Sequence, residues 1–389
     1  MLKESNKDYR MKKHSYIIML IILLLMGDLL TLPSEITLNS KISLIILAIF
    51  FIIFFIKDWI NYKFKIYDGL NFLILLLMLI ISAYFNDKVI IGLIILSLII
   101  YTIDFKDIFF EYFISQIFIF LFYFFLCIIG ILPLWSNGKF LVLGFNNKNI
   151  AGFILLNIFL FLILLNINSS FKNYIRDLIL LLSFLVAWFF MKDRSVGILM
   201  MLTGIIFLIL KQLKRINKLF KIIIISLPFI LTFLSIFLAV NYGKYDWINK
   251  LDILLSSRIQ IWHTYWNTFH LQLFPQNIDY YKYNFTIGES LLIKEAQDGF
   301  FALAPLQHGL IIFITIILLL SYTLKKIVDK FNKKQLLIFI ILVLLCFTEY
   351  SPFIYYYSCF LFPYVFGEIG REHRYENLID QNSNDINIQ

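Results

Sequence analysis

Long runs of apolar residues, separated by short polar stretches, make up most of this chain. A helix that crosses the hydrocarbon core of a membrane needs about 20 apolar residues, and only a helix satisfies its own backbone hydrogen bonds there. The pattern predicts twelve such spans, at 15–32, 42–56, 70–84, 89–103, 109–132, 150–167, 174–191, 195–210, 222–240, 300–323, 335–349 and 352–367. We therefore expect an all-α polytopic membrane protein.

One hydrophilic stretch, residues 241–299, interrupts the apolar pattern between the ninth and tenth spans. We expect a single transmembrane domain over residues 1–370 that carries this large loop, followed by a polar cytoplasmic tail at 371–389. The apolar run at 15–32 follows a basic segment but has no small-residue cleavage site, so we interpret it as a retained first span and not as a signal peptide.

A helical stripe of apolar residues lies inside the large loop. Its members are spaced by four, three, four, three and four positions: Leu255, Ile259, Trp262, Trp266, Phe269 and Leu273. This spacing predicts an amphipathic helix in the headgroup layer of the membrane, where Trp is preferred. We expect Arg258 to lie at its start, on the side facing away from the stripe.

Composition supports a membrane location and gives the orientation. Hydrophobic residues make up 61% of the chain and charged residues 15%, which excludes an ordinary soluble domain. The net charge of +9 comes from cations in short loops, so it indicates orientation in the bilayer and not nucleic-acid binding. With both termini cytoplasmic, 23 of the 34 Lys and Arg residues lie inside, most densely at 211–221 and 325–334. The large loop is then extracytoplasmic.

Few ionisable residues fall in or beside the spans. Asp28 and Glu349 lie near span ends, and His308 lies within the tenth span, where a packing histidine is the alternative to a functional one. Arg194 occupies the turn between the seventh and eighth spans, on the same face as the large loop. Asp298 ends that loop, and on a continuous helix Gly309 would lie on the same face of the tenth span.

The chain lacks a Walker loop, an H-E-x-x-H motif and the paired acidic residues of metal-held nucleotide-sugar chemistry. Its cytoplasmic loops are too short to form a nucleotide-binding domain. We therefore expect no metal and no cofactor, and any chemistry should take place outside the cell on a membrane-borne donor.

Four segments resemble the O-antigen ligase and polymerase family, which includes the Wzy-type bacterial polysaccharide polymerases. They are FNNKNIAGFIL (145–155) with Asn147 and Asn149, DRSVGIL (193–199) with Arg194, SSRIQIW (256–262) with Arg258 and Trp262, and QDGFFALAPLQHG (297–309) with Asp298 and Gly309. In the first segment Lys148 replaces the family's usual proline. The large loop also lacks the glycines that usually follow its proline, here Pro275.

The resemblance implies transfer of a saccharide chain from undecaprenyl pyrophosphate to the next lipid-linked repeat unit, in the bacterial cell membrane. Asp298 would accept the proton of the attacking hydroxyl, and Arg194 and Arg258 would stabilise the leaving pyrophosphate. We further expect five residues to contact substrate: Asn147, Asn149, Trp262, Gly309 and His308. Membrane lipids are expected partners, as are flippase and chain-length regulator proteins.

Two alternatives remain open. Ligases of this family place histidine where Asp298 stands, so the aspartate favours a polymerase over a ligase for O-antigen, capsule or exopolysaccharide. A flippase or transporter for lipid-linked oligosaccharide also fits twelve spans. Transporters favour charged or broken helices near the middle of the membrane, however, whereas the candidate residues here lie at the outer rim.

Overall fold

The computed structural model describes residues 45, 49, 66–100, 105–136, 139–145, 148–164, 170–276, 278, 286–287, 290–291, 298–354 and 361–368. The expected first span at 15–32, most of the second at 42–56 and the tail at 371–389 lie outside this part of the chain. Most of the large loop between residues 277 and 297 also lies outside it.

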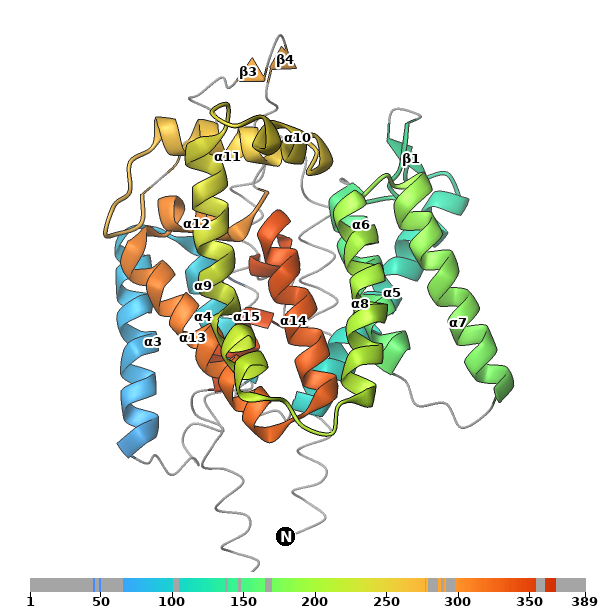
Figure 1. Cartoon of the computed structure of the whole chain (residues 1–389), viewed down its shortest axis with the longest axis horizontal. Helices are drawn as coiled ribbons and strands as arrows, with labels where there is room; N and C mark the ends of the chain where they lie inside the picture. The colour runs from blue at the N-terminus through green and yellow to red at the C-terminus, as the bar shows by residue number, and fades with distance from the viewer. Residues whose placement is uncertain are drawn as a thin grey trace, which may run out of the picture.

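Long helices run side by side, and short elements cover one end of the molecule (Figure 1). The long helices are α3 (Ile66–Tyr84), α4 (Lys88–Ile100), α5 (Phe105–Ile128), α6 (Lys148–Leu164), α7 (Ser170–Leu185), α8 (Arg194–Gln212), α9 (Lys218–Asn241), α13 (Gly309–Lys330) and α14 (Lys333–Thr348). The shorter ones are α10 (Asp246–Leu254), α11 (Arg258–Thr268), α12 (Phe300–Gln307) and α15 (Leu361–Glu368). Two small antiparallel ladders pair β1 (Trp135–Ser136) with β2 (Phe140–Leu141) and β3 (Thr286–Ile287) with β4 (Ser290–Leu291). The described chain is thus mostly helical, as the apolar pattern predicts.

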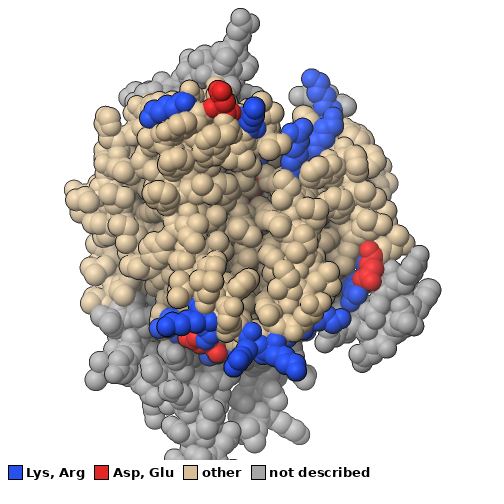
Figure 2. Space-filling model, in the orientation of Figure 1, with Lys and Arg blue, Asp and Glu red and all other residues tan. Residues whose placement is uncertain are grey.

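Four helical segments are long and apolar enough to cross a membrane: Phe110–Ile128, Arg194–Gln212, Lys218–Asn241 and Gly309–Lys330. Large apolar side chains point outward from them, such as Phe233 on α9, which is 73% exposed. A surface of this kind is unfavourable in water and suits contact with lipid. Figure 2 shows it as a belt of tan side chains between upper and lower groups of Lys and Arg. The molecule therefore has the character of a polytopic membrane protein.

The two most basic loops share the lower end of the molecule. The Nζ of Lys221, at the start of α9, lies 3.0 Å from Oδ1 of Asp329, near the end of α13. The Nζ of Lys333 donates to the carbonyl oxygen of Lys211 at 3.4 Å. The opposite, upper end carries α10, α11 and β1 (Figure 1). Residues 211–221 and 325–334 thus face away from the large loop.

The expected tenth span, 300–323, is not one continuous helix. Helix α12 ends at Gln307, and α13 begins at Gly309, whose φ of +75° is a left-handed value. Pro305 lacks a backbone N–H, and the N–H groups of Leu310 and Ile311 donate to the carbonyls of Gln272 and Leu273 at 2.9 and 3.2 Å. The expectation that Asp298 and Gly309 share one helix face is therefore wrong.

A glycine at this break permits close approach of the large loop. A Cβ atom on Gly309 would lie 2.4 Å from the carbonyl carbon of Phe274. Phe274 belongs to the chain that follows α11, so the small residue accommodates the protein's own backbone. The loop is thereby attached to the point where the helix is broken.

Helix α14 forms the centre of the core. It packs against α8, α9, α12 and α13, and its Leu336, Phe339, Val343 and Cys346 are fully buried. Because α14 is enclosed on several sides, its sequence is apolar all round and not amphipathic. The helix ends at Thr348, and Glu349, which follows it, is still buried.

Candidate functional site

Arg258 is set in place by a sharp bend between α10 and α11. Ser256 and Ser257 both adopt left-handed backbone conformations, with φ of 58° and 66°. Asp252 of α10 caps α11 from outside that helix: its Oδ1 accepts hydrogen bonds from the N–H of Ile259 at 2.8 Å and of Gln260 at 3.1 Å. Non-glycine residues in this region of φ store strain, which is common at functional sites. The bend turns the first side chain of α11 into the protein.

The helix expected in the large loop is present as α11, but its surroundings differ from the expectation. Ile259 and Trp262 of the apolar stripe are fully buried, and the indole Nε1 of Trp266 donates to the carbonyl of Ala302 at 2.9 Å. This part of the stripe thus packs on protein, chiefly α9 and α12, whereas Leu273, beyond the end of α11, is 59% exposed. Arg258 was expected at the start of this helix, on the side facing away from the stripe. It is the first residue of α11, and its side chain is itself buried, with 5% exposed.

The guanidinium of Arg258 joins three separate segments. Its Nη1 donates to the hydroxyl of Ser195 at 2.9 Å, and its Nη2 donates to Oε1 of Glu349. Its Nε forms an ion pair with Oδ2 of Asp298, at 3.2 Å. Glu349 is 1% exposed, whereas the side chain of Asp298 is 23% exposed. Of the two carboxylates that pair with Arg258, Asp298 is the one with access to solvent.

Asp298 is fixed through its backbone as well as its side chain. The indole Nε1 of Trp262 donates to its carbonyl oxygen at 2.7 Å. The next residue, Gly299, has a φ of +87°, and a Cβ there would lie 2.6 Å from the same Nε1. Only glycine fits both the backbone conformation and the space beside the indole. Helix α12 then begins directly after this turn.

The turn before α8 brings a second set of polar residues to the site. A short π-helical segment, Val186–Phe190, ends α7, and Lys192 follows with a left-handed φ of 53°. Such π segments are frequent at functional sites. The Oδ1 of Asp193 accepts a hydrogen bond from the N–H of Val196 at 3.2 Å and so caps α8. Arg194 is exposed, and it is the neighbouring Ser195 that reaches Arg258.

Burial and neighbouring charges shift the pKa values of Asp193, in the turn before α8, and of Arg258, at the start of α11. Burial raises the pKa of Asp193 from 3.8 to about 6, although Arg258 acts in the opposite direction. Burial alone would lower the pKa of Arg258, but the carboxylates of Glu349, Asp298 and Asp193 raise it above its ordinary value. Arg258 is therefore charged at any physiological pH. Asp193 changes its charge near neutrality.

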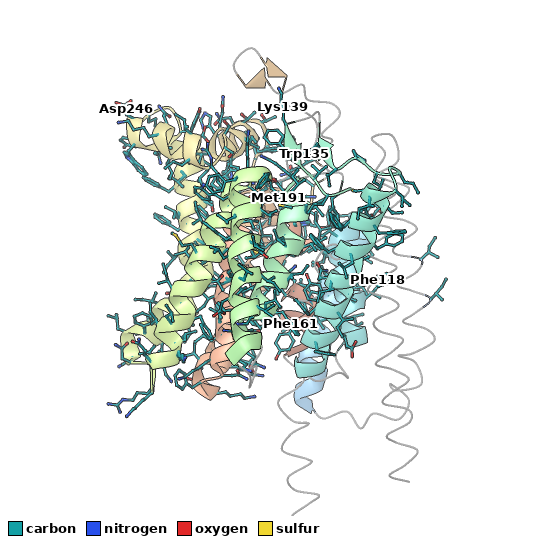
Figure 3. The ribbon with its side chains drawn as sticks, turned by 90° about the vertical axis from the view of Figure 1, so that its right-hand side faces the viewer. Phe118, Trp135, Lys139, Phe161, Met191 and Asp246 are labelled. Atoms are coloured by element: carbon teal, nitrogen blue, oxygen red, sulfur yellow. The ribbon has the colours of Figure 1, made fainter. Side chains whose placement is uncertain are left out.

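A group of cations borders this cluster on the outer side. The Nζ of Lys148, the first residue of α6, lies 4.6 Å from the centre of the Phe140 ring and donates to the carbonyl of Lys192 at 3.4 Å. The Nζ of Lys192 lies 5.6 Å from the same ring. Figure 3 places Lys139 and Trp135, from the β1–β2 hairpin, at the upper end of the molecule above Met191. Cations thus gather where the hairpin meets the turn before α8.

Four of the five expected substrate contacts lie outside the described residues or in segments other than that of Arg258. Asn147 is outside the described part of the chain, and Asn149 lies in the first turn of α6 beside Lys148. Gly309 contacts Phe274, as described above. His308 is fully buried, and both of its ring nitrogens have partners within the protein.

His308 belongs to a second polar cluster. Its Nδ1 lies 2.5 Å from Oδ2 of Asp87, and its Nε2 lies 2.5 Å from the hydroxyl of Tyr350. The Tyr350 hydroxyl also donates to Oε1 of Gln307 at 3.1 Å. Asp87 comes from the turn between α3 and α4, so this cluster ties that turn to the break between α12 and α13. The structure supports the interpretation of His308 as a packing histidine.

Several site residues were not identified from the sequence. Asp193 and Ser195 flank Arg194, yet only the arginine was selected, and Glu349 was interpreted as a residue at a span end. Their signal was weak because the partners are far apart in sequence: Arg258 lies 63 residues from Ser195 and 91 from Glu349. Within the described part of the chain, no cluster of three His, Cys, Asp or Glu residues is arranged to hold a metal ion.

Comparison with protein-family models, with curated proteins and with solved structures found no match. The residues of the site are therefore the basis for inferring a function.

Proposed function

We propose that this chain is a glycosyltransferase-type polymerase that joins oligosaccharide repeat units carried on undecaprenyl pyrophosphate. The observation that carries the proposal is the cluster of Arg258, Asp298 and Glu349 at the end of the molecule opposite the two basic loops. In the proposed topology the chain has twelve spans and both termini are cytoplasmic. The cluster then lies on the outer face of the bacterial cell membrane, where lipid-linked repeat units are assembled into capsule, O-antigen or exopolysaccharide.

The proposed reaction uses Asp298 as the base. Its carboxylate accepts the proton of a sugar hydroxyl on one lipid-linked unit, and that oxygen attacks the anomeric carbon of the other. A new glycosidic bond forms while the bond from this carbon to the pyrophosphate oxygen breaks. Undecaprenyl pyrophosphate leaves with the bonding electrons, and Arg194 and Arg258 stabilise its charge. Pyrophosphate is a good leaving group, so the residues of the chain suffice for the step and no cofactor is invoked.

Partial exposure supports the choice of Asp298. A catalytic base must reach its substrate, and Glu349 and Asp193 are both almost fully buried. Asp298 is more exposed than either, and the contacts of Trp262 and Arg258 hold it in one position. A carboxylate that is held in position and remains accessible suits general-base catalysis.

The test is to incubate the purified full-length protein with synthetic undecaprenyl-pyrophosphate-linked repeat units. A ladder of product lengths supports the polymerase. We expect Asp298→Asn to lower the rate by 10²-fold to 10⁴-fold, the usual contribution of a general base. Asp329→Asn, on the opposite end of the molecule, serves as the matched control. No ladder from the wild-type protein, or an undiminished one from Asp298→Asn, would refute the proposal.

The same experiment separates the alternatives. A single addition to a different acceptor, without a ladder, would indicate a ligase. If deletion in cells leaves single repeat units on the inner leaflet, the chain acts as a flippase, whereas accumulation on the outer leaflet supports the polymerase.

A further inference from the structure

The proposed reaction requires cations for a diphosphate, and the charge of Arg258 is already matched by its neighbours. Its guanidinium contacts the carboxylates of both Glu349 and Asp298, and it is 5% exposed. A buried cation that is paired twice offers little net attraction to an incoming anion. Other residues must therefore bind the diphosphate before the reaction begins.

Two lysines at the rim of the site have the required properties. The Nζ atoms of Lys148 and Lys192 lie 4.6 and 5.6 Å from the centre of the same ring, that of Phe140. Within the described part of the chain, neither lysine forms an ion pair with a carboxylate. The Nζ of Lys148 also lies within electrostatic range of Arg258 and of the carboxylates of Asp193, Glu349 and Asp298. Neither ammonium group is thus held by a direct carboxylate contact, and that of Lys148 lies within electrostatic range of the proposed base.

The backbone around these lysines favours an anion as well. Helix α6 begins at Lys148 and α8 begins at Arg194, and the two helices pack together. The first turn of a helix carries partial positive charge from its free N–H groups. The left-handed Lys192, with φ of 53°, is held in the turn before α8, where the N–H of Asp193 donates to the carbonyl of Ala187 at 3.1 Å. This conformation stores strain and is maintained by its surroundings.

The surface of the molecule agrees with this view. Figure 2 shows Lys and Arg side chains gathered at the upper right, over the end where Figure 1 labels β1 and α6. Lys139, which Figure 3 shows at the top of the hairpin, and Arg194 are both exposed there. In contrast to the lower end, where Lys221 pairs with Asp329, none of these upper cations forms a direct ion pair with a described carboxylate.

We propose that Lys148 and Lys192, arranged about Phe140, form the binding site for the diphosphate group of the lipid-linked donor, with Arg194 as a third contact. The inference rests on the proposed function and deepens it. Two groups of residues then have different roles: the lysine pair binds the diphosphate, and Arg258 holds Asp298. A diphosphate suits this edge better than a single phosphate, because two ammonium groups can each contact one phosphoryl group.

The test measures binding without turnover. Farnesyl diphosphate is titrated into the purified full-length protein in uncharged detergent micelles, and its affinity is measured by calorimetry. Lys148→Gln and Lys192→Gln should each weaken binding about tenfold, and the double variant about a hundredfold, as expected for charge-assisted contacts. Lys148→Arg and Lys192→Arg should retain binding, because they keep the charge.

The matched control is Lys244→Gln, which removes one exposed cation from the same end of the molecule, beside α10. It should bind as the wild type does. Equal affinity in the wild type and the double variant would overturn the inference, and so would an equal loss in Lys244→Gln. Competition by phosphatidylglycerol as strong as that by the diphosphate would also overturn it, since the lysines would then hold a lipid headgroup.

Polymerisation is measured separately, so the two proposals fail differently. If the wild type forms a ladder and the double variant binds farnesyl diphosphate normally, the lysine site is wrong and the polymerase stands. If diphosphate binding depends on the lysines but no ladder forms, the site stands and the polymerase is wrong.

Discussion

The buried ion pair between Arg258 and Glu349 should be among the most sensitive contacts in the molecule. Glu349→Gln removes one charge and leaves the guanidinium, which is 5% exposed, without its innermost partner. Breaking a buried pair in this way costs about 3–5 kcal/mol. Asp298 remains 3.2 Å from Nε, and the amide oxygen of the variant still accepts a hydrogen bond. We therefore expect the lower end, about 3 kcal/mol of unfolding free energy.

A second pair in the same chain provides the comparison. Lys221 and Asp329 lie 3.0 Å apart, but their side chains are 38% and 52% exposed. An exposed pair contributes about 0–1 kcal/mol, because water and salt screen it. Asp329→Asn makes the same kind of change as Glu349→Gln and should cost far less. The difference between the two variants measures the effect of burial.

The assay is reversible unfolding of the purified protein in mixed micelles, followed by tryptophan fluorescence as denaturing detergent is added. A double variant, Arg258→Met with Glu349→Leu, removes both charges and should recover most of the loss, since an apolar pair can replace a buried ion pair. Equal stability losses in Glu349→Gln and Asp329→Asn would refute the reasoning, because Glu349 would then not be buried against Arg258.

Three further predictions use the same unfolding assay. Gly299→Ala places a Cβ 2.6 Å from Nε1 of Trp262 and should lower the free energy of unfolding by at least about 2 kcal/mol. Gly204→Ala, with open space around it, should not destabilise the protein. Similar losses in the two variants would contradict the close contact between Gly299 and Trp262. Burial raises the pKa of Asp193 from 3.8 to about 6. The contribution of this carboxyl group to stability is therefore fully present below pH 3.8 and is lost as pH rises through 6, which lowers the free energy of unfolding by on the order of 3 kcal/mol. Asp193→Asn should flatten this slope, and an unchanged slope would assign it to another group. His308→Ala removes a hydrogen-bond partner from the buried Asp87 carboxylate and one partner from the Tyr350 hydroxyl, and should cost about 3 kcal/mol; a loss below about 1 kcal/mol would show that the cluster is not formed.

Apolar run length was enough to locate most of the helices. The expected spans from 70–84 to 222–240, and that at 335–349, each coincide with a helix, because hydrocarbon leaves the backbone no alternative to internal hydrogen bonds. The prediction of a continuous helix for the tenth span was wrong for a physical reason. Pro305 and Gly309 signalled a break, but a break at this depth needs acceptors for the freed N–H groups. These come from Gln272 and Leu273, which no local pattern connects to the helix.

The site shows the same division between local and distant information. Arg258 and Asp298 were selected together from sequence segments, and the structure brings them into contact. Ser195 was passed over in favour of its neighbour, although adjacent residues at a helix start point about 100° apart and only one faces inward. The position of Glu349 at the end of a span could be predicted. Its contact with Arg258 could not, because the spacing of residues within one segment carries no information about contacts with a distant segment.

The pairing of Arg258 couples proton transfer to the charge of the leaving group in the proposed reaction. Before reaction, Glu349 and Asp298 together offset the guanidinium. When Asp298 accepts the proton of the attacking hydroxyl, it loses its charge, and one of the two counter-charges on Arg258 disappears. Glu349 alone then offsets the positive charge of Arg258, while negative charge grows on the departing pyrophosphate. The attraction between Arg258 and the pyrophosphate is therefore stronger in the transition state than in the ground state. That difference, and not affinity for the bound donor, is what accelerates a chemical step. Lys148 and Lys192 then act mainly on binding, and Arg258 mainly on rate.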